Sequence, residues 1–505
     1  MSDLKVLARS RDALSDEFLQ AAVRFTADRL RGKKKVSTEA LGRWEEWRDR
    51  GQAIRAHTVS HLDFYLKQFA DNARQAGANV HFAATGDEAI SAVMHIAQEK
   101  QAKSVVKAKS MVSEEIHLNH HLQDAGIDVV ETDLGEYIVQ LAKETPSHII
   151  IPAIHKNREQ IRELFTEDGG KDLSTDTKVL AGFARRRLRE KFLNADIGVT
   201  GCNFGIAESG SICLFTNEGN ADMVTNLPKT HIVLMGMERL LPTFADLEVM
   251  ANLLPRSATG QKLTTYMSVI TGSKRSGDSD GAEEVHIIIL DNGRSRQLGD
   301  PDFHEILHCI RCGACLNVCP VYRHVGGHSY GSVYPGPIGA VLSPLLAKGR
   351  QEQARLEERG GVSTASGEQR GATPTMEDDY SDLPYASSLC GACYEACPVK
   401  IPLHDMLVKL RQKKVASGQT SGTERAMFRG FRIAFASPGR YRLSMGVGRA
   451  MQGPLVRDGY ITTTFGPLAG WTSSRYAPSL AKTSFRDGWA ALQHSLGDVS
   501  KEDGE

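Results

Sequence analysis

The stretch Cys309-Ile-Arg-Cys312-Gly-Ala-Cys315-Leu-Asn-Val-Cys319-Pro320 decides the fold of the second half of the chain. Its spacing is C-x2-C-x2-C-x3-C-P. Three closely spaced cysteines wrap around one small object, and the fourth, just before proline, leads away from it. Zinc sites usually use two C-x2-C pairs, without a third close cysteine. The motif therefore predicts iron–sulfur ligation.

A second motif, Cys390-Gly-Ala-Cys393-Tyr-Glu-Ala-Cys397-Pro398, repeats the last three cysteines and has Ser387 where the first would stand. In two-cluster ferredoxins the fourth cysteine of each motif ligates the other cluster. We therefore expect two [4Fe-4S] clusters, the second one thiolate short. The first cluster takes Cys309, Cys312, Cys315 and Cys397, and the second takes Cys319, Cys390 and Cys393.

Several groups could fill the open position on the second cluster. Ser387 could bind as an alkoxide, or a histidine such as His324 could fold in. One of the two remaining cysteines, Cys202 or Cys213, is another candidate, although their apolar surroundings favour a buried structural role. The iron could also stay open to water, substrate or a partner's ligand, or the cluster could hold three irons.

Composition narrows the class of protein. The chain has 505 residues, which favours two or three domains, and its 61 basic residues balance 61 acidic ones. This balance gives no reason to expect binding to nucleic acid or to an anionic membrane. The first residues contain no apolar signal-peptide core, and no run of about 18 apolar residues predicts a transmembrane helix. With seven of nine cysteines in metal-type motifs, we expect a cytoplasmic protein.

The first part of the chain is expected to be α/β. Residues 1–75 read as helical, with Lys33–Lys35 as a solvated loop. Residues 79–291 alternate strand-like runs with amphipathic stretches, which is typical of a largely parallel sheet with helices. Ser209-Gly210 predicts a hairpin. The expected strands are 79–84, 104–107, 128–132, 148–154, 231–235 and 285–290.

After Asp291 the strand pattern stops. Pro402–Lys413 is expected to be a helix, because its leucines and methionine recur at helical spacing. Lys348–Asp379 is polar and has almost no large apolar residues, which predicts a disordered insertion. Residues 421–505 read as a small C-terminal region of low regularity.

The residues resemble the lactate utilization protein B family, whose members are LUD-domain iron–sulfur proteins. In the second half, the resemblance rests on the two cysteine motifs and on Tyr334–Pro344 and Leu383–His404. In the first half it rests on Lys109–Ile116, Glu131–Glu136, Pro152–Lys156 and Ala207–Ile212. It covers nearly the whole chain, and the missing cysteine at Ser387 is the family's own pattern.

The resemblance implies a multidomain α/β plus α protein. A LUD domain, similar to the CoA-transferase and ribose-5-phosphate isomerase group, precedes an α-helical ferredoxin domain with two Fe–S clusters. We expect a helical extension at 1–75, the LUD α/β domain at 76–298, the ferredoxin domain at 299–420 with its insertion at 348–379, and a C-terminal region at 421–505.

The family also implies a function. Its members act with two further proteins, a second LUD protein and a cysteine-rich-domain protein, in oxidising L-lactate to pyruvate. The chain is then an oxidoreductase component that transfers electrons, rather than a complete enzyme. Two alternatives stay open: a scaffold with structural clusters, and a CoA-transferase-like enzyme with an appended ferredoxin.

The α/β half offers candidates for a small-molecule substrate site, because ligands gather at the carboxyl ends of parallel strands. Glu208 stands where the CoA-transferase group can place a catalytic glutamate, but the glycine-rich segment of that group is missing. His120-His121 are expected at the surface. The remaining candidates are Asn217, Glu218, Asn220, Asp222, Lys229 and His155-Lys156, weighed against a plain polar turn at 217–222.

Overall fold

The computed structural model describes residues 5–360, 380–462, 472 and 475–502. The chain divides into two compact units, Met1–Lys413 and Lys414–Glu505. The first unit contains the six-stranded and four-stranded sheets and both cysteine motifs. No helix in the described ranges is long and apolar enough to cross a membrane.

The first unit begins with four helices, which confirms the helical prediction for residues 5–75, whereas residues 1–4 lie outside the described ranges. Asp16 caps the second helix by accepting a hydrogen bond from the backbone N–H of Leu19. The buried residues of these helices face the cysteine motifs and the sheets. The helices are α1 (Lys5–Ser15), α2 (Glu17–Leu41), α3 (Trp44–Ser60) and α4 (Leu62–Gln75).

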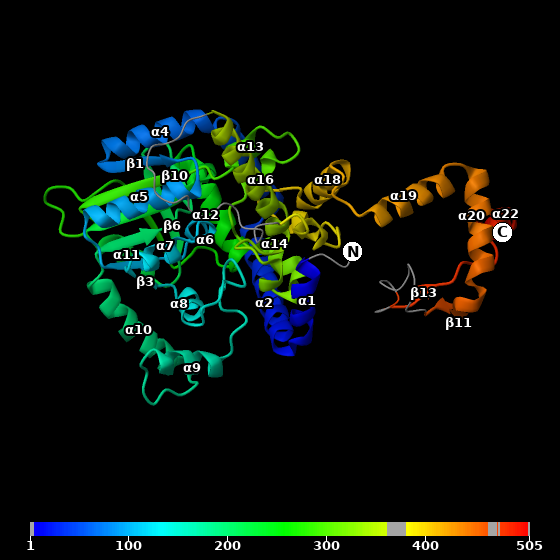
Figure 1. Cartoon of the computed structure of the whole chain (residues 1–505), viewed down its shortest axis with the longest axis horizontal. Helices are drawn as coiled ribbons and strands as arrows, with labels where there is room; N and C mark the ends of the chain where they lie inside the picture. The colour runs from blue at the N-terminus through cyan, green and yellow to red at the C-terminus, as the bar shows by residue number, and fades with distance from the viewer. Residues whose placement is uncertain (1–4, 361–379, 463–471, 473–474, 503–505) are drawn as a thin grey trace. The chain divides into compact units, whose positions relative to one another are not determined.

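Six strands form a parallel sheet in the order β1-β10-β7-β4-β2-β3, which confirms the α/β prediction (Figure 1). Strand β7 is buried along its whole length, as expected for a sheet covered on both faces. The strands are β1 (Ala78–Ala83), β2 (Ser104–Lys107), β3 (Asp128–Glu131), β4 (Ile197–Thr200), β7 (Thr230–Gly236) and β10 (Glu284–Leu290).

Alternating residues of the sheet pack against different helices. Ile232 and Leu234 face α5 (Gly86–Glu99), α6 (Met111–Glu115) and α7 (Leu118–Asp124). Val233 and Met235 face α4 on the other side. The rest of that second face, around β2 and β3, is covered by α8 (Leu134–Leu141), α9 (Arg158–Glu167), α10 (Thr177–Leu193) and α11 (Asn220–Asn226).

A second sheet of four strands has the order β8-β5-β6-β9. Strands β5 and β6 are antiparallel and are joined across Ser209-Gly210, so the predicted hairpin is confirmed. A capping box at Thr243 starts the helix that follows β8. The elements are β5 (Phe204–Ile206), β6 (Ser211–Thr216), η1 (Met237–Arg239), β8 (Leu240–Leu241), α12 (Phe244–Ala258) and β9 (Tyr266–Ile270).

The cysteine-rich part is helical, with the longer helices α16 and α18 among short ones, and does not fold as a separate body. Its apolar residues share one core with α2, α3 and α12. The helix predicted at Pro402–Lys413 is confirmed as α18. The elements are α13 (Arg294–Leu298), η2 (His304–His308), α14 (Ala314–Val318), α15 (Tyr322–Val325), η3 (His328–Tyr330), α16 (Gly336–Gly360), η5 (Leu383–Tyr385), α17 (Ala392–Ala396) and α18 (Leu403–Ala416).

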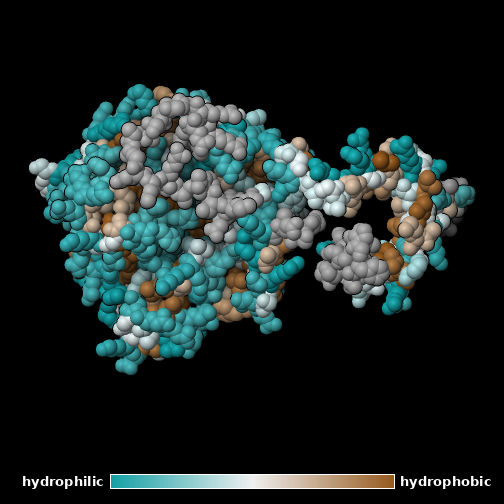
Figure 2. All heavy atoms as spheres, in the orientation of Figure 1, coloured by the Kyte–Doolittle hydropathy of each residue, from teal (hydrophilic) through white to brown (hydrophobic). Residues whose placement is uncertain are grey.

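The second unit is more regular than expected, so the prediction of low regularity for 421–505 is wrong. Ser421 and Ser437 cap two helices, which begin immediately after them. Apolar residues of these helices, among them Phe428 and Leu443, lie at the surface (Figure 2). The elements are α19 (Gly422–Phe435), α20 (Pro438–Gln452), η6 (Gly453–Leu455), β11 (Val456–Arg457), β12 (Tyr460–Ile461), β13 (Ala477–Pro478) and α22 (Phe485–Glu502).

Three further expectations are corrected. Residues 148–154 form turns instead of a strand, because the His148 ring accepts hydrogen bonds from the backbone N–H groups of Ile150 and Ile151. Lys33–Lys35 lie inside α2. The first part of Lys348–Asp379 continues α16 as far as residue 360, since its Gln, Glu, Arg and Ala residues favour a helix. Residues 361–379 lie outside the described ranges.

Candidate metal centre

The two cysteine motifs share one local backbone conformation. Arg311 and Leu389, each just before a cysteine, have φ values of 58° and 56°. The next residue but one is Gly313 or Gly391, with φ values of 72° and 80°. Non-glycine residues rarely adopt positive φ. The repeated geometry places Ser387 at the position that Cys309 occupies in the first motif.

Each motif then enters a five-residue helix and leaves it at its last cysteine. Helix α14 ends at Cys319 with φ −74° and ψ 119°, and α17 ends at Cys397 with φ −72° and ψ 121°. The two helices pack against each other. This packing carries the last cysteine of each motif toward the first cysteines of the other.

The sulfur atoms consequently gather in two cavities. One cavity is lined by Cys309, Cys312, Cys315 and Cys397, together with apolar residues such as Ile149 and Val399. We call it the first cavity. It brings three cysteines of the first motif together with one from the second.

The second cavity is lined by Cys319, Cys390 and Cys393. Ser387 and His404 contribute to the same wall. His324, a sequence candidate, is exposed and its Nδ1 lies 2.7 Å from the carbonyl oxygen of Pro320. Cys202 and Cys213 belong to the LUD half, near β5 and β6, where burial raises the pKa of both thiols to about 12.

The donor set in both cavities suits a thiolate-ligated cluster. Burial, followed by the proximity of Cys397, raises the pKa of Cys312 to about 12, and burial followed by the proximity of Cys319 does the same for Cys393. Converging buried thiols of this kind keep their protons unless a metal supplies compensating charge. Backbone N–H groups already approach the sulfurs, with Arg311 N 3.4 Å from Cys309 Sγ.

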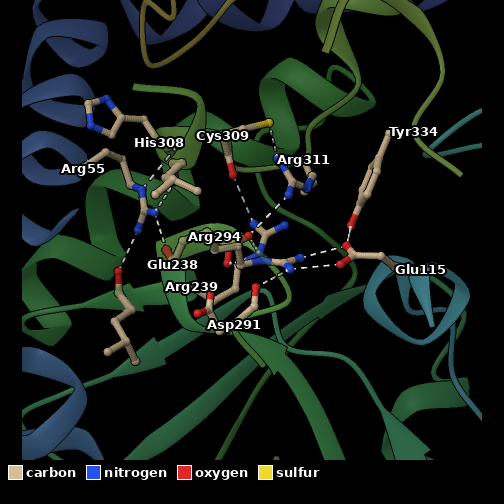
Figure 3. Close-up of polar contacts among 12 residues, drawn as sticks. Arg55, Glu115, Glu238, Arg239, Asp291, Arg294, His308, Cys309, Arg311 and Tyr334 are labelled. Atoms are coloured by element: carbon tan, nitrogen blue, oxygen red, sulfur yellow. Dashed lines mark hydrogen bonds and ion pairs between the residues drawn. The ribbon is translucent and has the colours of Figure 1, made fainter. Parts of the chain in front are cut away.

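A buried ion-pair network lies beneath the first cavity (Figure 3). Arg294 pairs with Glu115 and Glu238, with N–O distances of 2.8 Å in both cases. Glu238 also contacts Arg311 of the first cysteine motif at 3.3 Å. Tyr334 donates a hydrogen bond of 2.7 Å to Glu115. Burial opposes the charge on Glu115, but Arg294 outweighs it and lowers the pKa of this carboxyl to about 2.

Two more arginines hold the backbone around Cys309 (Figure 3). Arg55 is 1% exposed and donates hydrogen bonds to the carbonyl oxygens of Leu307 and His308, at 3.0 and 3.3 Å. Arg239 donates to the carbonyl oxygen of Cys309 at 3.3 Å. The cysteine loop is therefore fixed by one cation from α3 and one from η1.

Helices α2 and α3 also supply cations beside Cys397, in the wall of the first cavity. Lys34 donates a 2.5 Å hydrogen bond to the carbonyl oxygen of Ala396, and Arg48 donates one of 2.9 Å to that of Cys397. Burial lowers the pKa of Lys34, while the nearby thiols of Cys312 and Cys397 act in the opposite direction. The basic run Lys33–Lys35, which the sequence predicts to be a solvated loop, thus includes Lys34, which contacts the backbone beside the metal centre.

Replacing Lys34 by Met should lower the midpoint potential of a cluster in the first cavity. The cation favours the reduced, more negative cluster, so its loss shifts the potential by on the order of 50 mV. Potentiometric EPR titration measures the shift. Lys35→Met is the matched control, because the Lys35 side chain is 77% exposed. Equal potentials in the two variants would contradict the role of Lys34.

A second polar cluster lies at the carboxyl ends of β2 and β3. Lys107 is fully buried and pairs with Glu114 and Glu131, at 2.6 and 2.7 Å. Burial opposes the charge of Lys107, but the two carboxylates outweigh it and raise the pKa of the lysine. Strands β3 and β4 lie on opposite sides of β2, so the strand order reverses at this point. Ligands usually bind at the carboxyl ends of parallel strands beside such a reversal. We call this end of β2 and β3 the sheet edge.

Two carboxyl groups at this edge hold protons unusually well. Burial raises the pKa of Glu136 to about 8, against an opposing effect of Lys109, and its buried Oε1 has no hydrogen-bond partner among the described residues. Burial and then Asp133 raise the pKa of Glu218 to about 7. The edge therefore combines proton-holding carboxyls with the side chain of Lys109.

The stability of the chain should depend on Glu136. Its pKa is about 8 in the folded chain and 4.5 ordinarily, so the folded chain retains a proton that the unfolded chain releases. The stability contributed by this carboxyl is full below pH 4.5 and is lost as the pH rises through 8. Glu136→Gln should therefore melt close to wild type at pH 5 and be more stable at pH 9, by on the order of 3 kcal/mol.

Thermal unfolding followed by circular dichroism at both pH values measures this difference. Glu248→Gln serves as the control, because Glu248 is an exposed residue of α12. If Glu136→Gln and wild type lose the same stability between pH 5 and pH 9, the assignment of a retained proton to Glu136 is wrong.

The sequence candidates at 217–222 do not converge on one point. Glu218 accepts a hydrogen bond from the backbone N–H of Leu134 at 3.0 Å, and Asn220 bonds to Thr132 at 3.2 Å, so these two reach the sheet edge described above. Asn217 instead pairs with Gln261, and Asp222 accepts from Ser268 of β9.

The other candidates lie elsewhere. Glu208 accepts a 2.6 Å hydrogen bond from the backbone N–H of Phe244, the first residue of α12, and so caps that helix. Lys229 precedes β7, at the amino end of the parallel strands, and pairs with Glu283. His155 and Lys156 both contact Glu144. His120 and His121 are exposed, as expected.

Sequence reasoning missed Lys107, Glu131 and Glu136 as site residues. One signal was available: Lys107 and Glu131 are charged residues that directly end two apolar strand-like runs. The partners of Arg294 carried no such signal, because Glu115, Glu238 and Arg294 are far apart in the sequence.

Three family models match successive parts of the chain. The LUD domain family model matches residues 66–290, and the model of the 4Fe-4S dicluster domain matches residues 305–401. The model for the C-terminal part of lactate utilisation protein B matches residues 409–493. The cysteine-rich part is thus an iron–sulfur domain.

Full-length relatives decide the family. Lactate utilization protein B of Shouchella clausii is 49% identical over 494 residues, covering 98% of both chains. The chain belongs to the lactate utilization protein B family. The Geobacillus kaustophilus protein of the same name is 51% identical over 97% of this chain and 98% of its own.

One solved structure is also similar to part of this member of the lactate utilization protein B family. A DUF162 family protein from Deinococcus radiodurans covers 45% of the chain and 98% of its own length, with 16% identity and a TM-score of 0.27. The overall superposition at that score is too poor to add to the description of the fold.

Proposed function

We propose that the chain is the iron–sulfur electron-transfer subunit of a cytoplasmic system that oxidises L-lactate to pyruvate. The proposal rests above all on the two cavities, in which the thiols of both cysteine motifs converge. When bound, each cluster would accept and release one electron at a time. The two electrons of lactate oxidation could therefore pass through the chain in sequence.

The proposed ligands follow the cavities. In the first, Cys309, Cys312 and Cys315 of one motif meet Cys397 of the other. In the second, Cys390 and Cys393 meet Cys319. This grouping supports crosswise ligation of two [4Fe-4S] clusters, as in two-cluster ferredoxins. Crosswise ligation also ties the two loops together, so neither cluster can bind without both motifs.

The membership in the lactate utilization protein B family supports the substrate and the partners. We propose a second LUD protein and a cysteine-rich-domain protein as the partners. The chain shows no glycine-rich dinucleotide motif following a strand. The removal of hydrogen from lactate is accordingly assigned to the complex as a whole.

A series of neighbouring residues connects the sheet edge of the LUD domain with helix α14 of the cysteine-rich part. Lys109, which follows β2, lies near Glu136 and Glu218 at the sheet edge and also near His148. The His148 ring hydrogen-bonds to Asn317 of α14 at 3.2 Å. This edge, with a lysine available to a carboxylate, is our candidate site for a small acid or for a matching domain of a partner.

Lactate-dependent reduction of an artificial electron acceptor by the reconstituted three-protein system tests this function. The double variant Cys312→Ser/Cys393→Ser should reduce the acceptor no faster than the system without this subunit. Cys213→Ser, in the LUD core, is the matched control and should retain activity. Full activity of a double variant that is shown to lack iron would contradict electron transfer and favour a scaffold role.

A further inference from the structure

The second cavity holds three cysteines where a cubane cluster needs four outside ligands, one for each iron. The first cavity has its four thiols, so the shortage is confined to one site. Two side chains in the wall of the second cavity carry a further donor atom: Ser387 Oγ and a ring nitrogen of His404.

The Oγ atom of Ser387 already has a hydrogen-bond partner. Ser387 Oγ accepts a hydrogen bond from the backbone N–H of Leu389 at 3.1 Å, which closes the turn before Cys390. To bind iron as an alkoxide it would also have to lose a proton, whereas a neutral imidazole binds iron directly. His324 is exposed and bonds to Pro320 instead of reaching the cavity.

His404 has features that are typical of metal-binding histidines. Its Nδ1 is buried and has no hydrogen-bond partner among the described residues. Its other ring nitrogen, Nε2, lies 3.6 Å from the carboxylate of Asp405. Histidines that bind metals usually turn the second nitrogen toward a carboxylate, which fixes the ring. The ring also rests against Tyr394, with centroids 5.6 Å apart.

The fold explains this position. Helix α18 begins at Leu403, directly after the turn that carries Cys397 into the first cavity. Leu403 and Met406 are buried in the shared core, which fixes the first turn of the helix and leaves His404 at the wall of the second cavity. The place of His404 at this wall is thus set by residues that belong to the core.

We propose that His404 Nδ1 is the fourth ligand of the cluster in the second cavity. This inference rests on the crosswise ligation proposed above and adds the ligand that the cysteine pattern lacks. A neutral imidazole in place of an anionic thiolate leaves the cluster less negative, which favours its reduced state. The second cluster would therefore have the higher potential, as histidine ligation does in Rieske centres.

Pulsed EPR of the anaerobically prepared, dithionite-reduced full chain tests the proposal without any substitution. Labelling the histidines with ¹⁵N should change a strong nitrogen coupling in one of two cluster signals. In His404→Ala that coupling should vanish and the iron content should fall from about eight to about seven per chain. His404→Cys should restore the iron without the coupling.

Two variants serve as controls. Ser387→Ala and His324→Ala should both retain the iron and the nitrogen coupling of wild type. A second cluster without any histidine coupling, or a coupling that persists in His404→Ala, would overturn the role of His404 and leave crosswise ligation standing. A wild-type chain with one cluster only would overturn the crosswise scheme itself, and this inference with it.

Discussion

Cys397→Ser should abolish the cluster associated with the first motif, and Cys319→Ser should abolish the other. Each substituted cysteine belongs to one motif. The cavity that loses its thiol contains mainly cysteines of the other motif. Each variant should lose about four irons and retain one of the two EPR signals of wild type. Iron and sulfide quantitation with EPR of the reduced chain measures both effects.

The identity of the surviving signal distinguishes crosswise from separate ligation. Cys397→Ser should give the same residual spectrum as Cys309→Ser, and Cys319→Ser the same as Cys393→Ser. If Cys397→Ser instead matches Cys393→Ser, each motif holds its own cluster and the crosswise scheme is wrong. Cys213→Ser, which lines neither cavity, should leave both signals intact.

Arg294→Met should destabilise the first unit by about 4 kcal/mol, since breaking a buried pair typically costs about 3–5 kcal/mol. The guanidinium is fully buried and pairs with both Glu115 and Glu238. Its removal leaves two buried carboxylates facing each other with less compensating charge. The damage should spread to the metal centre, because Glu238 also pairs with Arg311 beside Cys309.

Thermal unfolding and iron retention measure this effect. Lys229→Met is the matched control: its partner Glu283 and the lysine itself are 59% and 79% exposed, so this pair contributes at most about 1 kcal/mol. Adding Glu238→Gln to Arg294→Met should recover part of the loss, because one uncompensated charge is removed. Equal melting temperatures for Arg294→Met and Lys229→Met would contradict the importance of the network.

Local pattern was sufficient to predict much of this fold. The cysteine spacing predicted that cysteines of the two motifs converge, and the alternation of apolar runs predicted the parallel sheet. The strand predicted at residues 148–154 does not form. Besides the hydrogen bonds of His148, contacts with a distant part of the chain contribute to this difference, and a local pattern cannot reveal such contacts. The isoleucines of this segment resemble a strand, but Ile149 packs in the core with Cys312 and Ala314, which come from the other half of the chain.

The candidate sites show the same limit. Lys34 reads as part of a solvated basic run, yet it contacts Ala396, more than 300 residues away. The network of Glu115, Glu238 and Arg294 joins three separate segments, and nothing in any one segment indicates the others. His404 was overlooked beside His324, because only the start of α18 on the shared core places its ring at the second cavity.

Addition of L-lactate to the anaerobic three-protein complex, followed by EPR, tests the central claim most directly. The account predicts that lactate alone produces the signals of reduced [4Fe-4S] clusters, and that these signals are absent when the complex contains Cys312→Ser/Cys393→Ser. If dithionite reduces the clusters but lactate reduces neither of them in an active complex, the chain is not an electron carrier for this reaction.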